Sequence, residues 1–131
     1  MSDNDNEGHS GFTISQIQGA MAGGLATKPN VVLLHAGTND LNRPETEQQT
    51  WADAPTRLGA LLDDVLEVVP DAVVIVAKII QAKSAQTAAN IRVFNKAVPD
   101  VVKQRVEMGS KIKVVDQSVV GAKDLVDGLH P

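Results

Sequence analysis

The sequence contains no cysteine and few aromatic residues. Of its 131 residues, only Phe12, Trp51 and Phe94 are aromatic. The absence of cysteine excludes a disulfide framework, a thiolate metal site and a cysteine nucleophile. The core must therefore be built from Val, Leu, Ile and Ala. The length is typical of a single domain, which we expect to span residues 1–131.

An excess of basic residues and long apolar runs are lacking as well. Lys and Arg number 12 against 16 Asp and Glu, which gives a formal net charge of -4 at pH 7. Without a basic surface for phosphates, nucleic acid is not an expected partner. The longest apolar runs, such as residues 31–36 and 72–77, are too short to span a bilayer, and no apolar stretch follows Met1. We therefore expect no membrane association and no signal peptide in this chain.

The apolar periodicity predicts three helices. The first begins at Thr13, which has a glutamine three positions later in the arrangement of a capping box. The second covers residues 53–69, where Leu and Val recur at the spacing of a core-facing stripe. The third begins after Ser84 and contains Pro99, which is expected to bend or split it.

Three short apolar runs predict strands between and after these helices. Residues 31–36 form a continuous aliphatic run, typical of a parallel strand that is covered on both faces. Residues 73–77 predict a second buried strand, and residues 111–115, with two lysines, a strand near the edge of the sheet. Residues 37–50 are predicted to be a polar loop. The alternation of helices and strands predicts an α/β fold with a parallel sheet.

Two polar clusters follow predicted strands, where ligands bind in open parallel sheets. Asp127 and His130 are close enough in sequence for the carboxylate to hold the imidazole Nδ1–H, which leaves Nε2 free as a general base. The alternative is a pair of exposed loop side chains. Asn39 can donate its amide hydrogens to an oxyanion or form an Asx-turn, and Gly37 allows the chain to turn out of the strand.

The two clusters lie in two of three segments that resemble the SGNH hydrolases, also called the GDSL esterase and lipase superfamily. The segments are His-Ser-Gly-Phe-Thr at 9–13, Ala-Gly-Thr-Asn-Asp at 36–40 and Asp-Gly-Leu-His-Pro at 127–131. The sequences of these segments are especially similar to those of the acetyl xylan esterases among the microbial carbohydrate esterases. The resemblance implies a three-layer sandwich with a flavodoxin-like parallel sheet, of which this chain carries about three strands.

The resemblance also implies a site and a substrate class. Gly11 would supply a backbone N–H and Asn39 a side-chain amide to the oxyanion hole, while His130 would be the general base and Asp127 its orienting carboxylate. The substrate would be an acetylated carbohydrate or another short acyl ester, hydrolysed without metal or cofactor. The acidic residues near the N-terminus do not follow the spacing of a calcium loop either. Members of the family are often secreted, so the compartment and the oligomeric state stay open.

The nucleophile of the family is missing from the sequence. The family places a serine in a Gly-Asp-Ser motif on a strand before the region that matches residue 1, and it continues past Pro131 with a helix. We therefore expect a truncated domain. Ser10 is not expected to replace that serine, because no apolar strand leads into it and Phe12 stands where an elbow motif has glycine. The chain alone is predicted to be inactive.

Other residues have two interpretations. His35, inside a predicted strand, is expected to be a buried histidine with a satisfied hydrogen bond rather than a catalytic one. His9 is expected to be a loop histidine, although it could line an ester site. Trp51 is expected to anchor the core, and the alternative is a platform for a sugar ring.

Two other functions remain as alternatives. One is a non-catalytic carbohydrate-binding or regulatory remnant of such an esterase. The other is a flavodoxin-like nucleotide or phosphate binder, because fold class alone does not determine function. Neither a Gly-x-Gly-x-x-Gly run nor a Walker-type loop follows any predicted strand, which argues against the second alternative.

Overall fold

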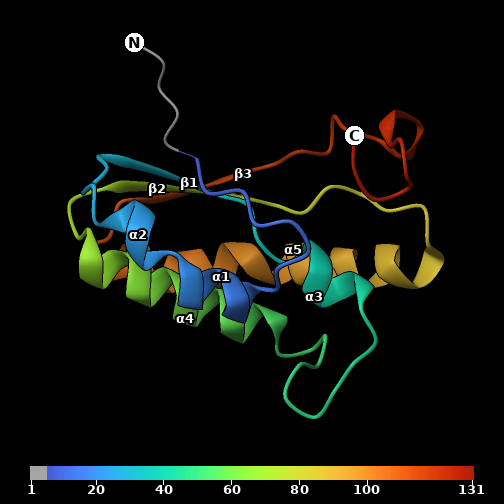
Figure 1. Cartoon of the computed structure of the whole chain (residues 1–131), viewed down its shortest axis with the longest axis horizontal. Coiled ribbons are helices and arrows are strands. Elements are labelled where there is room, and N and C mark those ends of the chain that lie inside the picture. The colour runs from blue at the N-terminus through green and yellow to red at the C-terminus, as the bar shows by residue number, and fades with distance from the viewer. Residues whose placement is uncertain (1–5) are drawn as a thin grey trace.

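A three-stranded parallel sheet with helices over one face forms the frame of the chain (Figure 1). The computed structural model describes residues 6–131, so the loop expected at residues 1–5 lies outside the described part. The strands are ordered β1-β2-β3, with β2 in the centre. Along the chain the elements are α1 (Ile14–Ala20), α2 (Ala22–Leu25), β1 (Val31–Leu34), α3 (Thr38–Asn42), α4 (Ala54–Val68), β2 (Val73–Ala77), α5 (Ala85–Glu107), β3 (Ile112–Val115) and the 3₁₀ helix η1 (Ala122–Asp124).

The two faces of the sheet have different surroundings. Val74 and Val76 of β2 point into the core beneath the sheet, whereas Val31 and Leu33 of β1 are 52% and 76% exposed. The expectation that residues 31–36 are covered on both faces is therefore wrong, because β1 is an edge strand and its outer face has no helical layer in the described residues. Residues 6–131 supply two layers of the expected three-layer sandwich. The edge position of β3 agrees with the prediction.

The core lies between the sheet and the helices, and it is almost entirely aliphatic. Its largest side chain is Phe94 of α5, which is 1% exposed and contacts the start of the loop that follows β1. A Cβ atom on Gly37 would lie 3.2 Å from Cζ of Phe94, and Gly37 has φ of 129°. Both constraints require glycine at this position, where the chain leaves β1 toward α3. The other large, fully buried side chains come from α1, α3, α4, α5 and β2: Ile14, Leu41, Leu58, Leu61, Leu62, Ile91, Val74, Val76 and Val98.

The helices differ from the predictions in three places. The first predicted helix is broken at Met21 into α1 and α2, within a stretch containing three glycines, which have low helix propensity. Pro99 does not split α5, since buried Val98 and Val102 hold both of its sides against the core. The predicted loop after β1 contains the short helix α3. Among the described residues, no helix combines the length and the apolar character needed to cross a membrane.

Candidate active site

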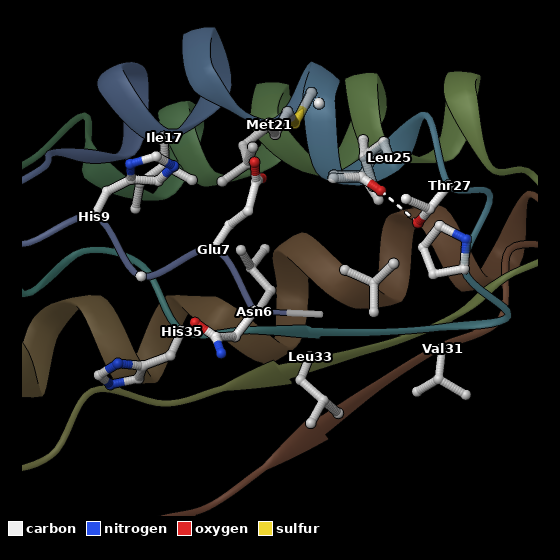
Figure 2. A pocket seen from close by; sticks show the side chains of 18 residues that line it. Asn6, Glu7, His9, Ile17, Met21, Leu25, Thr27, Val31, Leu33 and His35 are labelled. Carbon is white, nitrogen blue, oxygen red and sulfur yellow. Dashed lines mark hydrogen bonds between the residues drawn. The ribbon is translucent and has the colours of Figure 1, made fainter. Parts of the chain in front are cut away.

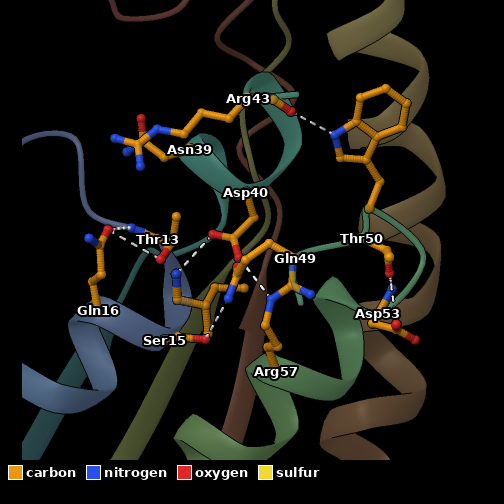
Figure 3. Close-up of polar contacts among 12 residues, drawn as sticks. Thr13, Ser15, Gln16, Asn39, Asp40, Arg43, Gln49, Thr50, Asp53 and Arg57 are labelled. Carbon is orange, nitrogen blue, oxygen red and sulfur yellow. Dashed lines mark hydrogen bonds and ion pairs between the residues drawn. The ribbon is translucent and has the colours of Figure 1, made fainter. Parts of the chain in front are cut away.

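The loop after β1 places Asn39 against the segment that follows Gly11, and Figure 3 shows Asn39 with Asp40 and Arg43 of the same loop. The side-chain amide of Asn39 donates to the backbone carbonyl of Phe12 at 3.0 Å, which places it one residue from Gly11. Gly11 has φ of 79° in the turn closed by the hydrogen bond from Phe12 N–H to the His9 carbonyl. Among the described residues the N–H of Gly11 has no hydrogen-bond partner. The side-chain amide of Asn39 is thus bonded one residue after Gly11, whose N–H is unpaired among the described residues, and their use as an oxyanion hole stays a prediction.

The predicted contact between Asp127 and His130 is present at the C-terminal end of the chain. Nδ1 of His130 lies 2.7 Å from Oδ2 of Asp127, and Oδ1 of Asp127 accepts the backbone N–H groups of Leu129 and His130 at 2.8 and 2.7 Å. The hydrogen bond from the His130 ring, followed by those from the two backbone amides, lowers the pKa of Asp127 far below its usual value. The carboxylate therefore stays ionised at neutral pH and holds the Nδ1–H tautomer, which leaves Nε2 of His130 as an acceptor.

His35 lies near this pair, although it was predicted to be buried. It follows the last residue of β1 and is exposed, because β1 is an edge strand. Desolvation first, and the charge of His130 second, lower the pKa of His35 from 6.5. Because the side chain is exposed, the desolvation is only partial. His35 follows the carboxyl end of β1, and the carbonyl of Gly128 accepts the N–H of Lys83, which follows β2, so His35 and the loop of residues 126–131 both lie beyond the carboxyl ends of the parallel strands.

Replacing His130 with alanine is expected to raise the pKa of His35 toward about 6.5, its ordinary value. A histidine whose pKa is lowered by folding stabilises the fold above its unfolded pKa and loses that contribution as the pH falls. The contribution of His35 to stability should thus fall less between pH 7 and pH 5 in the variant than in the unaltered chain. A histidine titration followed by NMR measures the shift, and His9→Ala serves as the control. An unchanged His35 pKa in His130→Ala would contradict the proximity of the two rings.

Asp40, next to Asn39, makes contacts that were not predicted from the sequence. Its side chain is 0% exposed, and Oδ2 accepts the backbone N–H of Ile14, the first residue of α1, at 2.8 Å. Oδ1 accepts Nε of Arg57 in α4 at 3.0 Å (Figure 3). Within the part of the chain that the structure describes, the Nη1 and Nη2 atoms of Arg57 are buried without a hydrogen-bond partner. These partners are 26 and 17 residues away from Asp40, so no local pattern could have indicated them.

A large cavity lies beside the proposed site residues rather than on them. It has a volume of about 1040 Å³ and runs between the edge of β1 and the helices α1 and α2, with His9 and His35 at one end (Figure 2). Gly11, Asn39 and His130 do not line it. A smaller cavity of about 360 Å³ is lined by Asp127, together with Asn42, Ala82, Lys83, Ser84, Gly128 and Leu129.

The remaining candidates have different environments from those expected. Trp51 is only half-buried, lies outside the core cluster and donates its indole N–H to the carbonyl of Arg43 at 2.9 Å, so the expectation of a core anchor is wrong. Its ring instead holds the loop between α3 and α4. His9 is half-buried and stacks on Phe12 with ring centroids 4.7 Å apart. Ser10 is exposed in the turn before Gly11. No group of three or more His, Asp or Glu side chains able to hold a metal ion occurs in residues 6–131.

The family of the chain follows from comparison with protein-family models. The GDSL-like Lipase/Acylhydrolase family matches residues 2–131, which is nearly the whole chain. The chain belongs to this family. The resemblance inferred from the three sequence segments is thereby confirmed. A search of curated protein sequences found no match.

Solved structures of carbohydrate esterases have the same fold as this family member. A family 3 carbohydrate esterase from Clostridium thermocellum is 31% identical, with a TM-score of 0.72 over 98% of this chain and 61% of its own. A carbohydrate esterase family 3 protein from Talaromyces cellulolyticus is 31% identical, with a TM-score of 0.79 over 95% and 61%. An acetylxylan esterase from Geobacillus stearothermophilus, at 18% identity and a TM-score of 0.73 over 96% and 63%, shares the fold. The chain thus spans 61% of the length of the first two relatives.

Proposed function

We propose that this chain carries the oxyanion-binding groups and the general base of an ester hydrolase acting on acetylated carbohydrates or other short acyl esters. The observation that carries the proposal is the 2.7 Å contact between Nδ1 of His130 and Asp127. Family membership supports ester hydrolysis, and the two relatives at 31% identity support a carbohydrate ester as the substrate. Asp127, His130, Gly11 and Asn39 are the residues to which we assign the chemistry.

The proton-transfer half of the reaction rests on His130. Asp127 holds its ring through Nδ1 and stays ionised, so it stabilises the imidazolium that forms when Nε2 takes a proton. In acyl transfer this proton comes from the attacking hydroxyl and passes to the leaving alcohol. A general base in this position contributes typically about 10²–10⁴-fold to the rate.

The charge-stabilising half rests on Gly11 and Asn39. In ester hydrolysis the carbonyl oxygen becomes negatively charged in the tetrahedral intermediate, and donors that point at it before the reaction lower the barrier. The N–H of Gly11 is unpaired among the described residues, and Asn39 has two amide hydrogens, of which one bonds to the carbonyl of Phe12. Removal of one such donor typically reduces kcat by about 10²–10³-fold.

The attacking oxygen is not assigned to any residue of this chain. No Gly-Asp-Ser segment occurs in the 131 residues. Ser10 is exposed in a turn, and no strand of residues 6–9 leads into it, unlike a nucleophile elbow. We therefore assign two parts of an esterase site to this chain and leave the nucleophile unassigned.

Acetate is the carboxylate that hydrolysis of an acetyl ester releases. We expect it to bind at Gly11 and Asn39. In a ¹⁵N-labelled sample, sodium acetate should shift the Gly11 backbone amide and the Asn39 side-chain amide, because both donate toward the same anion position. Titration with sodium chloride at equal ionic strength is the control. Acetate-induced shifts confined to other residues would contradict the assignment of the oxyanion hole.

Without a nucleophile, the chain is expected to hydrolyse p-nitrophenyl acetate no faster than buffer. The physical reason is that an oxyanion hole and a base stabilise an attack that no group in the chain can begin. The measurement is the release of p-nitrophenolate at pH 7 to 8 by the unaltered chain and by His130→Ala. Turnover above background that disappears in His130→Ala would show a nucleophile that we have not assigned.

The missing nucleophile also favours a second candidate, a non-catalytic carbohydrate-binding remnant. Such a protein would bind acetylated oligosaccharides without hydrolysing them. Calorimetry with acetylated and deacetylated xylo-oligosaccharides separates the two candidates, because a carbohydrate-binding remnant would retain affinity for the deacetylated form. The half-buried Trp51 is the side chain in this chain most suited to contact a sugar ring.

A further inference from the structure

Three consecutive peptide groups beside Gly11 are each held by a different side chain from α3 and its end. Arg43 donates Nη2 to the carbonyl of Gly11 at 2.5 Å. Asn39 donates its amide to the carbonyl of Phe12 at 3.0 Å. Asp40 accepts the N–H of Ile14 at 2.8 Å. The peptides that join residues 11–12, 12–13 and 13–14 are therefore fixed one after another by a single short segment.

The segment that holds these peptides is itself anchored. Asp40 is fully buried and paired with Arg57 of α4, so its carboxylate cannot move without exposing or unpairing a buried charge. The backbone N–H of Arg43 donates to the Asn39 carbonyl, and the Arg43 carbonyl accepts the indole N–H of Trp51. The hydrogen bonds that residues 39, 40 and 43 make thus connect the buried Asp40–Arg57 pair with the turn at Gly11.

The turn at Gly11 needs such support. Gly11 has φ of 79°, and glycine has more conformational freedom than any other residue. Its carbonyl is bonded to Arg43, an exposed side chain that approaches within 3.5 Å of the position of a Cβ on Gly11. Fixing the peptide that follows Gly11 restricts the direction of the N–H that precedes it, since only φ and ψ of Gly11 lie between them.

We propose that Arg43 and Asp40 are positioning residues that orient the Gly11 N–H and the Asn39 amide toward one anion. This inference rests on the proposed function, because the anion is the ester oxyanion. Neither side chain needs to touch the substrate. Arg43 acts through the carbonyl of Gly11, and Asp40 acts through the N–H of Ile14.

The test compares Arg43→Met with Arg92→Met in the full chain by NMR. Arg92 lies exposed on α5 and serves as the matched control. In the absence of ligand, the backbone order parameter of Gly11 should fall from about 0.85 to about 0.6 in Arg43→Met and stay unchanged in Arg92→Met. The dissociation constant for sodium acetate should rise about three- to tenfold in Arg43→Met, the effect of one lost hydrogen bond.

A second variant, Asp40→Asn, tests the other contact and keeps the shape of the side chain. It should also lower the order of Gly11, provided that circular dichroism shows an intact fold. If the order of Gly11 is unchanged in Arg43→Met, the inference is overturned, even if acetate affinity falls, because Arg43 would then act through its charge alone. If the order falls but acetate does not shift Gly11 or Asn39 in the unaltered chain, the proposed oxyanion hole is overturned while the positioning by Arg43 stands.

Discussion

Replacing Asp40 with alanine is expected to lower the free energy of unfolding by about 3 to 5 kcal/mol, the usual cost of removing one partner from a buried ion pair. The guanidinium of Arg57 would lose its carboxylate, and its Nη atoms already have no partner among the described residues. The N–H of Ile14 would lose its acceptor as well. Urea denaturation followed by circular dichroism measures the free energy of unfolding of the variant and of the unaltered chain.

The matched control for this prediction is Asp63→Ala. Asp63 accepts two hydrogen bonds from Arg105, both at 2.7 Å, but its side chain is 60% exposed. Water can replace the carboxylate there, so the loss should be under about 1 kcal/mol. Equal losses in the free energy of unfolding of the two variants would mean that the burial of Asp40 does not increase its contribution to stability.

Replacing Leu33 with lysine is expected to weaken self-association of the chain. The apparent dissociation constant should rise at least about tenfold. Leu33 is 76% exposed on the open face of the sheet, beside Val31 (Figure 2). Burying one such side chain in a contact contributes about 1.5 to 3 kcal/mol, and 1.4 kcal/mol corresponds to a factor of ten. Light scattering after size-exclusion chromatography over a concentration series measures the effect.

The edge of β1 adds a second reason for this association. The carbonyl of Asn30 accepts the N–H of Val73, so the backbone groups of residues 31 and 33 alternate outward, away from β2. An unpaired apolar edge is a template for another strand. Val93→Lys is the control, since Val93 is 68% exposed on α5 but lies away from the sheet. A chain that is monomeric at every concentration and melts cooperatively would contradict the prediction.

The parallel α/β fold could be predicted because its signals are local. Asp53 and Ser84 precede α4 and α5 as expected, and Ser84 accepts the N–H of Thr87. The buried face of β2 follows from its run of Val and Ile. The exposure of β1 could not be predicted in the same way, because an aliphatic run looks the same whether or not another layer covers it.

The candidate site divides along the same line. Asp127 and His130 are three residues apart, and their contact follows from a turn that the sequence itself contains. Gly11 and Asn39 were paired by resemblance, and the structure adds a hydrogen bond from Asn39 to the carbonyl of Phe12, the residue after Gly11. His35 was predicted to be buried, yet it is exposed because the strand before it is an edge strand.

By itself, the sequence determined the order of the elements, the family segments and the absence of a Gly-Asp-Ser nucleophile in these 131 residues. The tertiary structure decided which face of the sheet is open and which side chains hold Gly11. Periodicity and capping act over three or four residues and can be recognised in a sequence. The contacts of Asp40 with Ile14 and Arg57 join residues 26 and 17 positions apart, and such pairs exist only once the helices have packed.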